Sequence, residues 1–195
     1  MTELDRLASI LEGGGVIAIP TDTVYGLACH PDRPDAAERL FAIKRRPPEM
    51  ELSLLAATPE DAACFGHLTA QARRLADAFW PGPLSIIVPA TTPRHPAIPR
   101  QGDTISLRVP ASPMLRGLLA RTGPLATTSA NLHGQAPAAT AEEVHHLLGG
   151  QIDAVLDGGP ASGQPSTIID CSVTPARVLR TGPLGDAELQ PYLEG

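Results

Sequence analysis

Apolar positions along the chain alternate between helical and extended spacing. Helical spacing joins Leu4, Leu7, Ile10 and Leu11, and three glycines follow at 13–15. Because glycine commonly ends helices, this segment predicts an amphipathic helix that stops there. The continuous apolar run VIAIP comes next and indicates a short buried strand at residues 16–20.

The same two patterns interleave over the rest of the chain. Further helices are predicted at residues 34–46, 69–80, about 112–121, 141–150 and 186–193, and further strands at 52–56, 84–90, 105–110, 124–130, 152–159, 166–171 and 177–182. Pro34 suits a first helical turn, Thr69 is the expected N-cap of its helix, and Thr140 with Glu143 forms a capping-box pattern. This order predicts a single α/β domain over residues 1–195, built on one twisted, mixed β-sheet with flanking helices.

Composition narrows the class of protein. Hydrophobic residues make up 43% of the 195 residues, yet no apolar run approaches the length of a membrane span, and the N-terminus does not resemble a signal peptide. Three cysteines without a CxxC pair indicate reduced thiols in a cytoplasmic protein. The net charge of −6 and an aromatic content of 3% argue against a broad nucleic-acid-binding face, but leave room for a small basic pocket.

Residues 20–28, PTDTVYGLA, are predicted to form a loop directly after the first strand. Such loops often carry ligand groups in α/β sheets, and Thr21, Thr23 and Tyr25 offer three hydroxyls. A structural interpretation stands beside this one: the hydroxyls could hold a turn in which Gly26 adopts an unusual backbone angle. Both interpretations remain open at this point.

Lys44 is the only lysine among 15 lysine and arginine residues, and it lies near the predicted end of a helix, in KRRP. The helix dipole stabilises a cation at the C-terminal end of a helix, and this explanation suffices for Arg45. Lys44 and Arg46, two residues apart, could instead converge on one phosphate, since a compact ammonium and a planar guanidinium bind different atoms. A compositional accident is the alternative for the lysine.

Other polar residues stand at strand ends. Ser129 and Asn131 in TTSANLHG share one side of a strand end and could form a polar binding lip, although no GxSxG nucleophile pattern is present. The glycine-rich segment 157–170 lacks GK[ST], so it is not a Walker A loop. Ser166 and Thr167 at its end could meet a carboxylate.

Two arginines, Arg108 and Arg180, lie within otherwise apolar strands. A buried arginine needs a partner, so each is either paired within the protein or faces an anionic ligand. The six histidines form no HExxH or HxxxH pattern, and no protein-held metal is expected.

Taken together, seven segments resemble the YrdC/TsaC-type L-threonylcarbamoyladenylate synthase family. They are PTDTVYGL, FAIKRRP, FWPGPLSIIV, LRVP, TTSANLHG, DGGPASGQPSTIID and RVLRTG, in the order and spacing of that family, from about residue 14 to 182. The resemblance is to the short, single-domain form, without the C-terminal domain of the longer branch. It implies a YrdC-like fold with a basic concave cavity.

The resemblance also implies a reaction, in which L-threonine, bicarbonate and ATP give threonylcarbamoyl-AMP and pyrophosphate. Mg²⁺ would be bound through the ATP phosphates. Downstream transferase proteins would pass the threonylcarbamoyl group to an adenosine of certain tRNAs, so direct but weak tRNA binding stays open. No membrane partner is expected.

Matching the family's motifs residue by residue gives site expectations. KxR matches Lys44 and Arg46, which would be catalytic. The residues expected to bind L-threonine are Thr23, Arg108 and Ser166. The residues expected to bind ATP are Lys44, Arg46, Thr104, Ser129, Asn131 and Arg180.

One stretch departs from the family's pattern. Where the family usually reads xxKPLS, this chain reads PEMELS, so that Met50 and Glu51 stand where a cationic or polar residue and a proline are expected. This departure keeps a divergent paralogue with weakened or altered activity as one alternative function. An RNA-binding module is the other, and the net charge counts against it.

Overall fold

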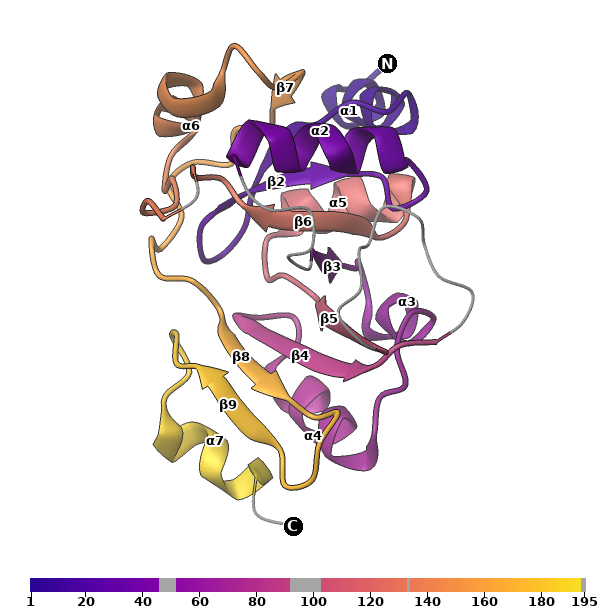
Figure 1. Ribbon diagram of the computed structural model, residues 1–195, viewed down its shortest axis with the longest axis vertical. Coiled ribbons are helices and arrows are strands. Elements are labelled where there is room, and N and C mark those ends of the chain that lie inside the picture. The colour runs from indigo at the N-terminus through magenta and orange to yellow at the C-terminus, as the bar shows by residue number, and fades with distance from the viewer. Residues whose placement is uncertain (46–51, 92–102, 133, 194–195) are drawn as a thin grey trace.

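The computed structural model describes residues 1–45, 52–91, 103–132 and 134–193, and its strands join in one nine-stranded sheet (Figure 1). The strand order is β7-β1-β2-β6-β3-β5-β4-β8-β9, with parallel and antiparallel neighbours. The strands are β1 (Ile17–Pro20), β2 (Tyr25–Cys29), β3 (Ser53–Leu55), β4 (Leu84–Pro89), β5 (Thr104–Arg108), β6 (Leu125–Ser129), β7 (Ala154–Val155), β8 (Thr167–Asp170) and β9 (Arg177–Arg180). The predicted mixed α/β architecture is confirmed.

The helices are α1 (Glu3–Glu12), α2 (Pro34–Lys44), α3 (Pro59–Ala63), α4 (Ala70–Phe79), α5 (Pro113–Thr122), α6 (Ala141–Leu148) and α7 (Asp186–Leu193). Thr69 is the N-cap of α4, as predicted, because its hydroxyl accepts a hydrogen bond from the backbone N–H of Ala72. In the described part of the chain, no helix is both long enough and apolar enough to cross a bilayer.

Two elements were not predicted. The segment that was expected to be a loop contains β2, which pairs antiparallel with β1 and is buried at every residue. A strand buried on both faces lacks the alternation that identifies strands in a sequence. Gly26 has no positive φ; instead, a Cβ there would come within 3.2 Å of the Thr128 carbonyl oxygen, so glycine permits close strand approach. The short helix α3 was not predicted at all.

Helices cover both faces of the sheet. At the β1–β2–β6 end, α1 and α5 cover one face, while α2 and α6 cover the other, and the two cores meet through the strands. In Figure 1, α2 accordingly lies in front of these strands and α5 behind them. At the β5–β4–β8 end, α3, α4 and α7 bury Leu107, Ile86 and Ile169.

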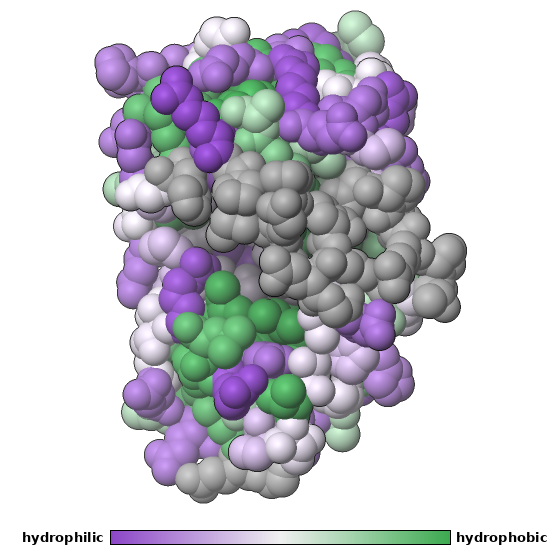
Figure 2. Space-filling model, viewed as in Figure 1, coloured by the Kyte–Doolittle hydropathy of each residue, from purple (hydrophilic) through white to green (hydrophobic). Residues whose placement is uncertain are grey.

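The middle strands keep one face polar. On β5, Ile105 and Leu107 point into the apolar core, so alternation turns Thr104, Ser106 and Arg108 to the opposite face. This polar face is the floor of the site described below. Figure 2 shows hydrophobic residues gathered on the lower half of the viewed side, where Figure 1 draws β4, β8 and β9. Leu179 on β9 is 54% exposed.

Candidate active site

A cavity of about 450 Å³ opens over the polar face of the middle strands. Nine of its lining residues carry hydroxyls, two carry guanidinium groups and one carries an amide. The lining residues are Thr21, Thr23, Val24, Gly26, Ser53, Leu55, Ser85, Ile87, Ser106, Arg108, Thr127, Thr128, Ser129, Asn131, Pro137, Pro165, Ser166, Ile168 and Arg180. This composition suits a polar, anionic ligand better than an apolar one.

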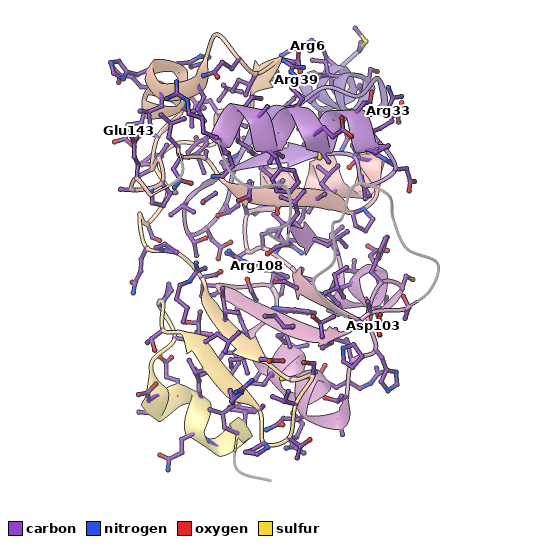
Figure 3. All side chains as sticks on the ribbon, viewed as in Figure 1. Arg6, Arg33, Arg39, Asp103, Arg108 and Glu143 are labelled. Carbon is purple, nitrogen blue, oxygen red and sulfur yellow. The ribbon has the colours of Figure 1, made fainter. Side chains whose placement is uncertain are left out.

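Arg108, at the end of β5, is 5% exposed and lies near the middle of the molecule (Figure 3). Its Nη2 donates to the Asp22 carboxylate at 2.7 Å, its Nη1 to the Thr23 hydroxyl at 2.9 Å, and its Nε to the Gly82 carbonyl at 2.9 Å. Asp22 also accepts from the backbone N–H of Ala111 at 3.0 Å. These contacts fix the guanidinium plane and leave two of its five N–H groups for a ligand.

A second cation shares the cavity. Arg180 donates from Nε to the Ser166 carbonyl at 2.9 Å and from Nη2 to the Ser166 hydroxyl at 3.2 Å. Burial lowers the pKa of Arg108, Asp22 acts to raise it, and the nearby charge of Arg180 lowers it further. Burial likewise lowers the pKa of Arg180. Since guanidinium groups stay protonated in proteins, two positive charges face one cavity, and among the described contacts only that of Arg108 is paired with a carboxylate. This arrangement favours an anion.

In the turn before β2, one hydroxyl stabilises the turn and another faces the cavity, so both roles considered for residues 20–28 are present. The Thr21 hydroxyl donates to the Val24 carbonyl at 2.6 Å and accepts from the backbone N–H groups of Thr23 and Val24, which is a structural role. The Thr23 hydroxyl instead faces Arg108 in the cavity. Tyr25 is fully buried, and its hydroxyl donates to the Gly159 carbonyl at 2.9 Å, so it holds the glycine-rich segment in place.

Lys44 is 2% exposed and holds the strand end opposite it. Its ammonium donates to the Ser129 carbonyl, to the Asn131 carbonyl at 2.9 Å and to Asn131 Oδ1 at 2.7 Å. The Ser129 hydroxyl donates to the same Oδ1 at 2.6 Å, and the Asn131 amide donates to the Gln135 carbonyl at 2.7 Å. The lysine therefore braces the two residues that the sequence predicted as a binding lip.

The structure brings most of the predicted site residues to one place. Six of them line the cavity: Thr23, Arg108, Ser129, Asn131, Ser166 and Arg180. Thr104 lies on the same face of β5 but is not among the lining residues, and Lys44 acts behind the lining. The predictions for Arg46, Met50 and Glu51 lie outside the described residues. Arg180, expected at ATP, lies beside Ser166, which was expected at threonine.

The sequence reasoning missed five lining hydroxyls, at Ser53, Ser85, Ser106, Thr127 and Thr128. It also missed Asp22, the carboxylate partner of Arg108. Polar residues at alternate positions of ISLRVP and PLATTSA were the available signal, because alternation puts them on one face. Within the described part of the chain, no group of three or more His, Cys, Asp or Glu side chains could hold a metal ion.

Comparison with known proteins relates the cavity to a family. Residues 9–182 match the family model Sua5_yciO_yrdC, described as "Telomere recombination". A protein of Vibrio campbellii named "Threonylcarbamoyl-AMP synthase" is 36% identical over 187 residues, which is 93% of this chain and 100% of that protein. A Vibrio parahaemolyticus protein of the same name shows the same identity and coverage.

Solved structures of similar proteins have the same fold as this chain. The crystal structure of P. abyssi Sua5 complexed with L-threonine aligns with a TM-score of 0.93 at 31% identity, over 98% of this chain and 57% of that one. The present chain thus spans little more than half the length of that protein. E. coli YciO aligns with a TM-score of 0.86 at 30% identity, over 97% of this chain and 92% of that one. From the matched family model and these relatives, the chain belongs to the Sua5/YciO/YrdC family.

Proposed function

We propose that this protein is a threonylcarbamoyl-AMP synthase, a nucleotidyltransferase that joins L-threonine, bicarbonate and ATP. One observation carries the proposal: a hydroxyl-rich cavity with two arginines lies in a chain 36% identical to proteins of that name. A relative at 31% identity was solved with L-threonine. Arg108, Thr23 and Ser166 are the residues proposed to bind threonine, with the free N–H groups of Arg108 directed to its carboxylate.

The proposed reaction has two bond-forming steps. The neutral threonine amine attacks the carbon of bicarbonate, and a C–O bond breaks. The departing hydroxide takes one amine proton and leaves as water, so that the carbamate nitrogen keeps one N–H. A carbamate oxygen then attacks the α-phosphorus of ATP, and the bond from that phosphorus to the bridging oxygen breaks, so pyrophosphate leaves. Neither step needs a side-chain nucleophile. The protein's work is to hold the reactants in line and to neutralise developing negative charge.

ATP is proposed to lie at the Ser129 end, near Asn131, with Thr104 and Arg46 toward the phosphates. Lys44 then serves by holding Ser129 and Asn131 in place; direct contact between Lys44 and phosphate stays a prediction. The described lining offers hydroxyls, an amide and guanidinium groups but no carboxylate. Mg²⁺ would therefore be coordinated by the ATP phosphates and would neutralise part of their charge. Transfer to tRNA by partner proteins and a cytoplasmic location belong to this same proposal.

The test is an assay of AMP-adduct formation in which threonine, bicarbonate and ATP are each omitted in turn. We expect product only with all three, and a preference for threonine over serine of about 10–200-fold, as one methyl group in a pocket usually gives. Arg108→Ala serves as the inactive reference. Adduct formation at an undiminished rate without bicarbonate would reject the carbamate route.

A further inference from the structure

Three hydroxyl residues form a continuous row across the cavity floor. The strand register puts Thr127 on β6 opposite Ser53 on β3, and Ser53 opposite Ser106 on β5. The Ser53 hydroxyl donates to the Ser106 hydroxyl at 3.1 Å, and the Thr127 hydroxyl donates to the Ser53 carbonyl at 3.1 Å. All three residues line the cavity, and together they are called the floor row below.

The floor row stands where apolar side chains would stabilise the sheet more. The other face of the same three strands carries Leu54, Leu107 and Ala126 at the neighbouring positions, each fully buried in a hydrophobic core. A hydroxyl at the centre of a sheet contributes little to stability unless a polar partner meets it. Ser53 and Thr127 donate within the row, whereas no described protein group accepts the proton of the Ser106 hydroxyl, and this indicates a polar ligand above the row.

Register also places the floor row between the two ends of the cavity. Along β5, Arg108 stands two residues beyond Ser106, and Thr104 stands two residues before it; along β6, Ser129 stands two residues beyond Thr127, on the Thr104 side. Strands rise about 3.3 Å per residue, so each end lies roughly 7 Å from the row. If threonine binds at Arg108 and ATP at Ser129, as the proposed function holds, the row lies beneath the group that joins them.

We infer that the floor row binds the planar carbonate group of the reaction, first as bicarbonate and then as the carbamate carboxylate. Ser106 is the donor to that group: its hydroxyl accepts from Ser53, and among the described contacts no protein acceptor takes its own proton. A hydroxyl proton directed at a carbonate oxygen is a charge-assisted hydrogen bond, stronger than a neutral one. The inference rests on the proposed function and adds a site for its third substrate.

The test is steady-state kinetics of Ser106→Ala, with each of the three substrates titrated at saturating levels of the others. We expect the KM for bicarbonate to rise about 10–100-fold, the range for one lost hydrogen bond to a charged group, while the KM values for threonine and ATP change less than about threefold. Ser106→Thr keeps a hydroxyl and should keep a near-normal KM for bicarbonate. Ser53→Ala, which removes the neighbouring donor, should shift the same constant in the same direction.

Ser9→Ala is the matched control, because Ser9 lies on the exposed side of α1 and its hydroxyl only bonds the Asp5 carbonyl. An unchanged KM for bicarbonate in Ser106→Ala overturns the inference while leaving the proposed function intact. A rise confined to threonine would assign the row to the threonine side chain instead, and an equal rise in all three constants would indicate a distorted floor. A wild-type protein that forms no bicarbonate-dependent adduct rejects the proposed function itself.

Should Ser106→Ala fail to fold, thermal melting will show it, and Ser53→Ala with Thr127→Val then carries the test. The expected result is again a rise in the KM for bicarbonate alone. If both of these variants match the wild type in all three constants, the inference is rejected.

Discussion

A compact ammonium fits the position of Lys44 better than a guanidinium would. Three oxygen acceptors converge on the one nitrogen, from Ser129 and Asn131, within a site that is almost closed to solvent. Three rotatable N–H groups on a single atom match that arrangement, whereas the fork of arginine spreads its donors over a plane. The sequence singled out this residue, and its contact with a phosphate stays a prediction.

We predict that Lys44→Arg is nearly as damaging as Lys44→Met. Both should lower kcat/KM for ATP by about 10²–10³, because Ser129 and Asn131 lose the group that positions them. Threonine binding, measured by calorimetry, should change little, since the described contacts of Lys44 are with Ser129 and Asn131 and not with Arg108 or Ser166. Arg45→Asn is the control, as an exposed neighbouring cation at a positive φ that asparagine tolerates. Full activity in Lys44→Arg would contradict the bracing role.

A second prediction at the residue scale concerns how much Asp22 contributes to the stability of the fold. It pairs with Arg108 at side-chain exposures of 20% and 6%, respectively, whereas Glu3 pairs with Arg6 at 62% and 50%. Removing one partner of a buried pair leaves an uncompensated charge, so Asp22→Ala should lower the free energy of unfolding by roughly 2–4 kcal/mol. Glu3→Ala should cost less than about 1 kcal/mol. Urea titrations of both variants decide this, and equal costs would mean that Arg108 does not depend on Asp22.

At the scale of elements, Asp153 lies just before the edge strand β7 and connects it to the start of β1 and to α2. Its carboxylate accepts from the backbone N–H of Val16 at 2.7 Å and from Arg39 on α2 at 2.6 Å. Burial acts to raise the pKa of Asp153, but the hydrogen bonds from Arg39 and Val16 outweigh it, and the pKa falls below its ordinary value of 3.8. The ionised form is therefore the one that stabilises this edge.

A lowered carboxyl pKa means stability that is present above the unfolded-state pKa and lost as pH falls through the folded-state pKa. We predict that wild type is more stable than Asp153→Asn at pH 7 and that this difference shrinks once the pH drops below about 3.8. Chemical unfolding at several pH values measures it. A difference that stays constant with pH would show that the charge of Asp153 contributes nothing.

Elements with a clear period were predictable, and those without one were not. The amphipathic helix α4 and its Thr69 cap follow directly from spacing, and the structure ends that helix within one residue of the prediction. Strand β2 was not predicted because it is buried on both faces, so that Leu27 and Ala28 show no alternation of apolar and polar residues. Strand β7 was expected to be longer; only Ala154 and Val155 pair with β1, although β1 continues to Pro20.

The same distinction holds for the site. Arg108 and Arg180 were identifiable as charges in apolar strands, and Ser129 with Asn131 as a polar strand end. The floor row was not, because β3 lies between β5 and β6 only after the chain has folded, and no local pattern states which strands become neighbours. Sheet order is thus the part of the site that sequence reasoning could not supply.

At the scale of the whole molecule, the parts that stabilise the fold differ from the parts that line the cavity. Helices on both faces bury the apolar side chains, and the middle strands are left to present arginines and hydroxyls to one cavity. This arrangement suits a reaction that joins three small, charged reactants without a covalent enzyme intermediate. An RNA-binding module would instead show affinity for tRNA with a steep dependence on salt.

The most direct test of this account is mass spectrometry of the AMP adduct made with ¹³C-bicarbonate, unlabelled threonine and ATP. The account predicts a threonine-containing adduct one mass unit heavier than that made with ordinary bicarbonate, with one pyrophosphate released for each adduct. The label should sit in the carbonyl between the threonine nitrogen and the phosphate. An adduct of threonine and AMP without the label would show direct adenylation of the threonine carboxylate in place of carbamate chemistry, and would contradict the central claim.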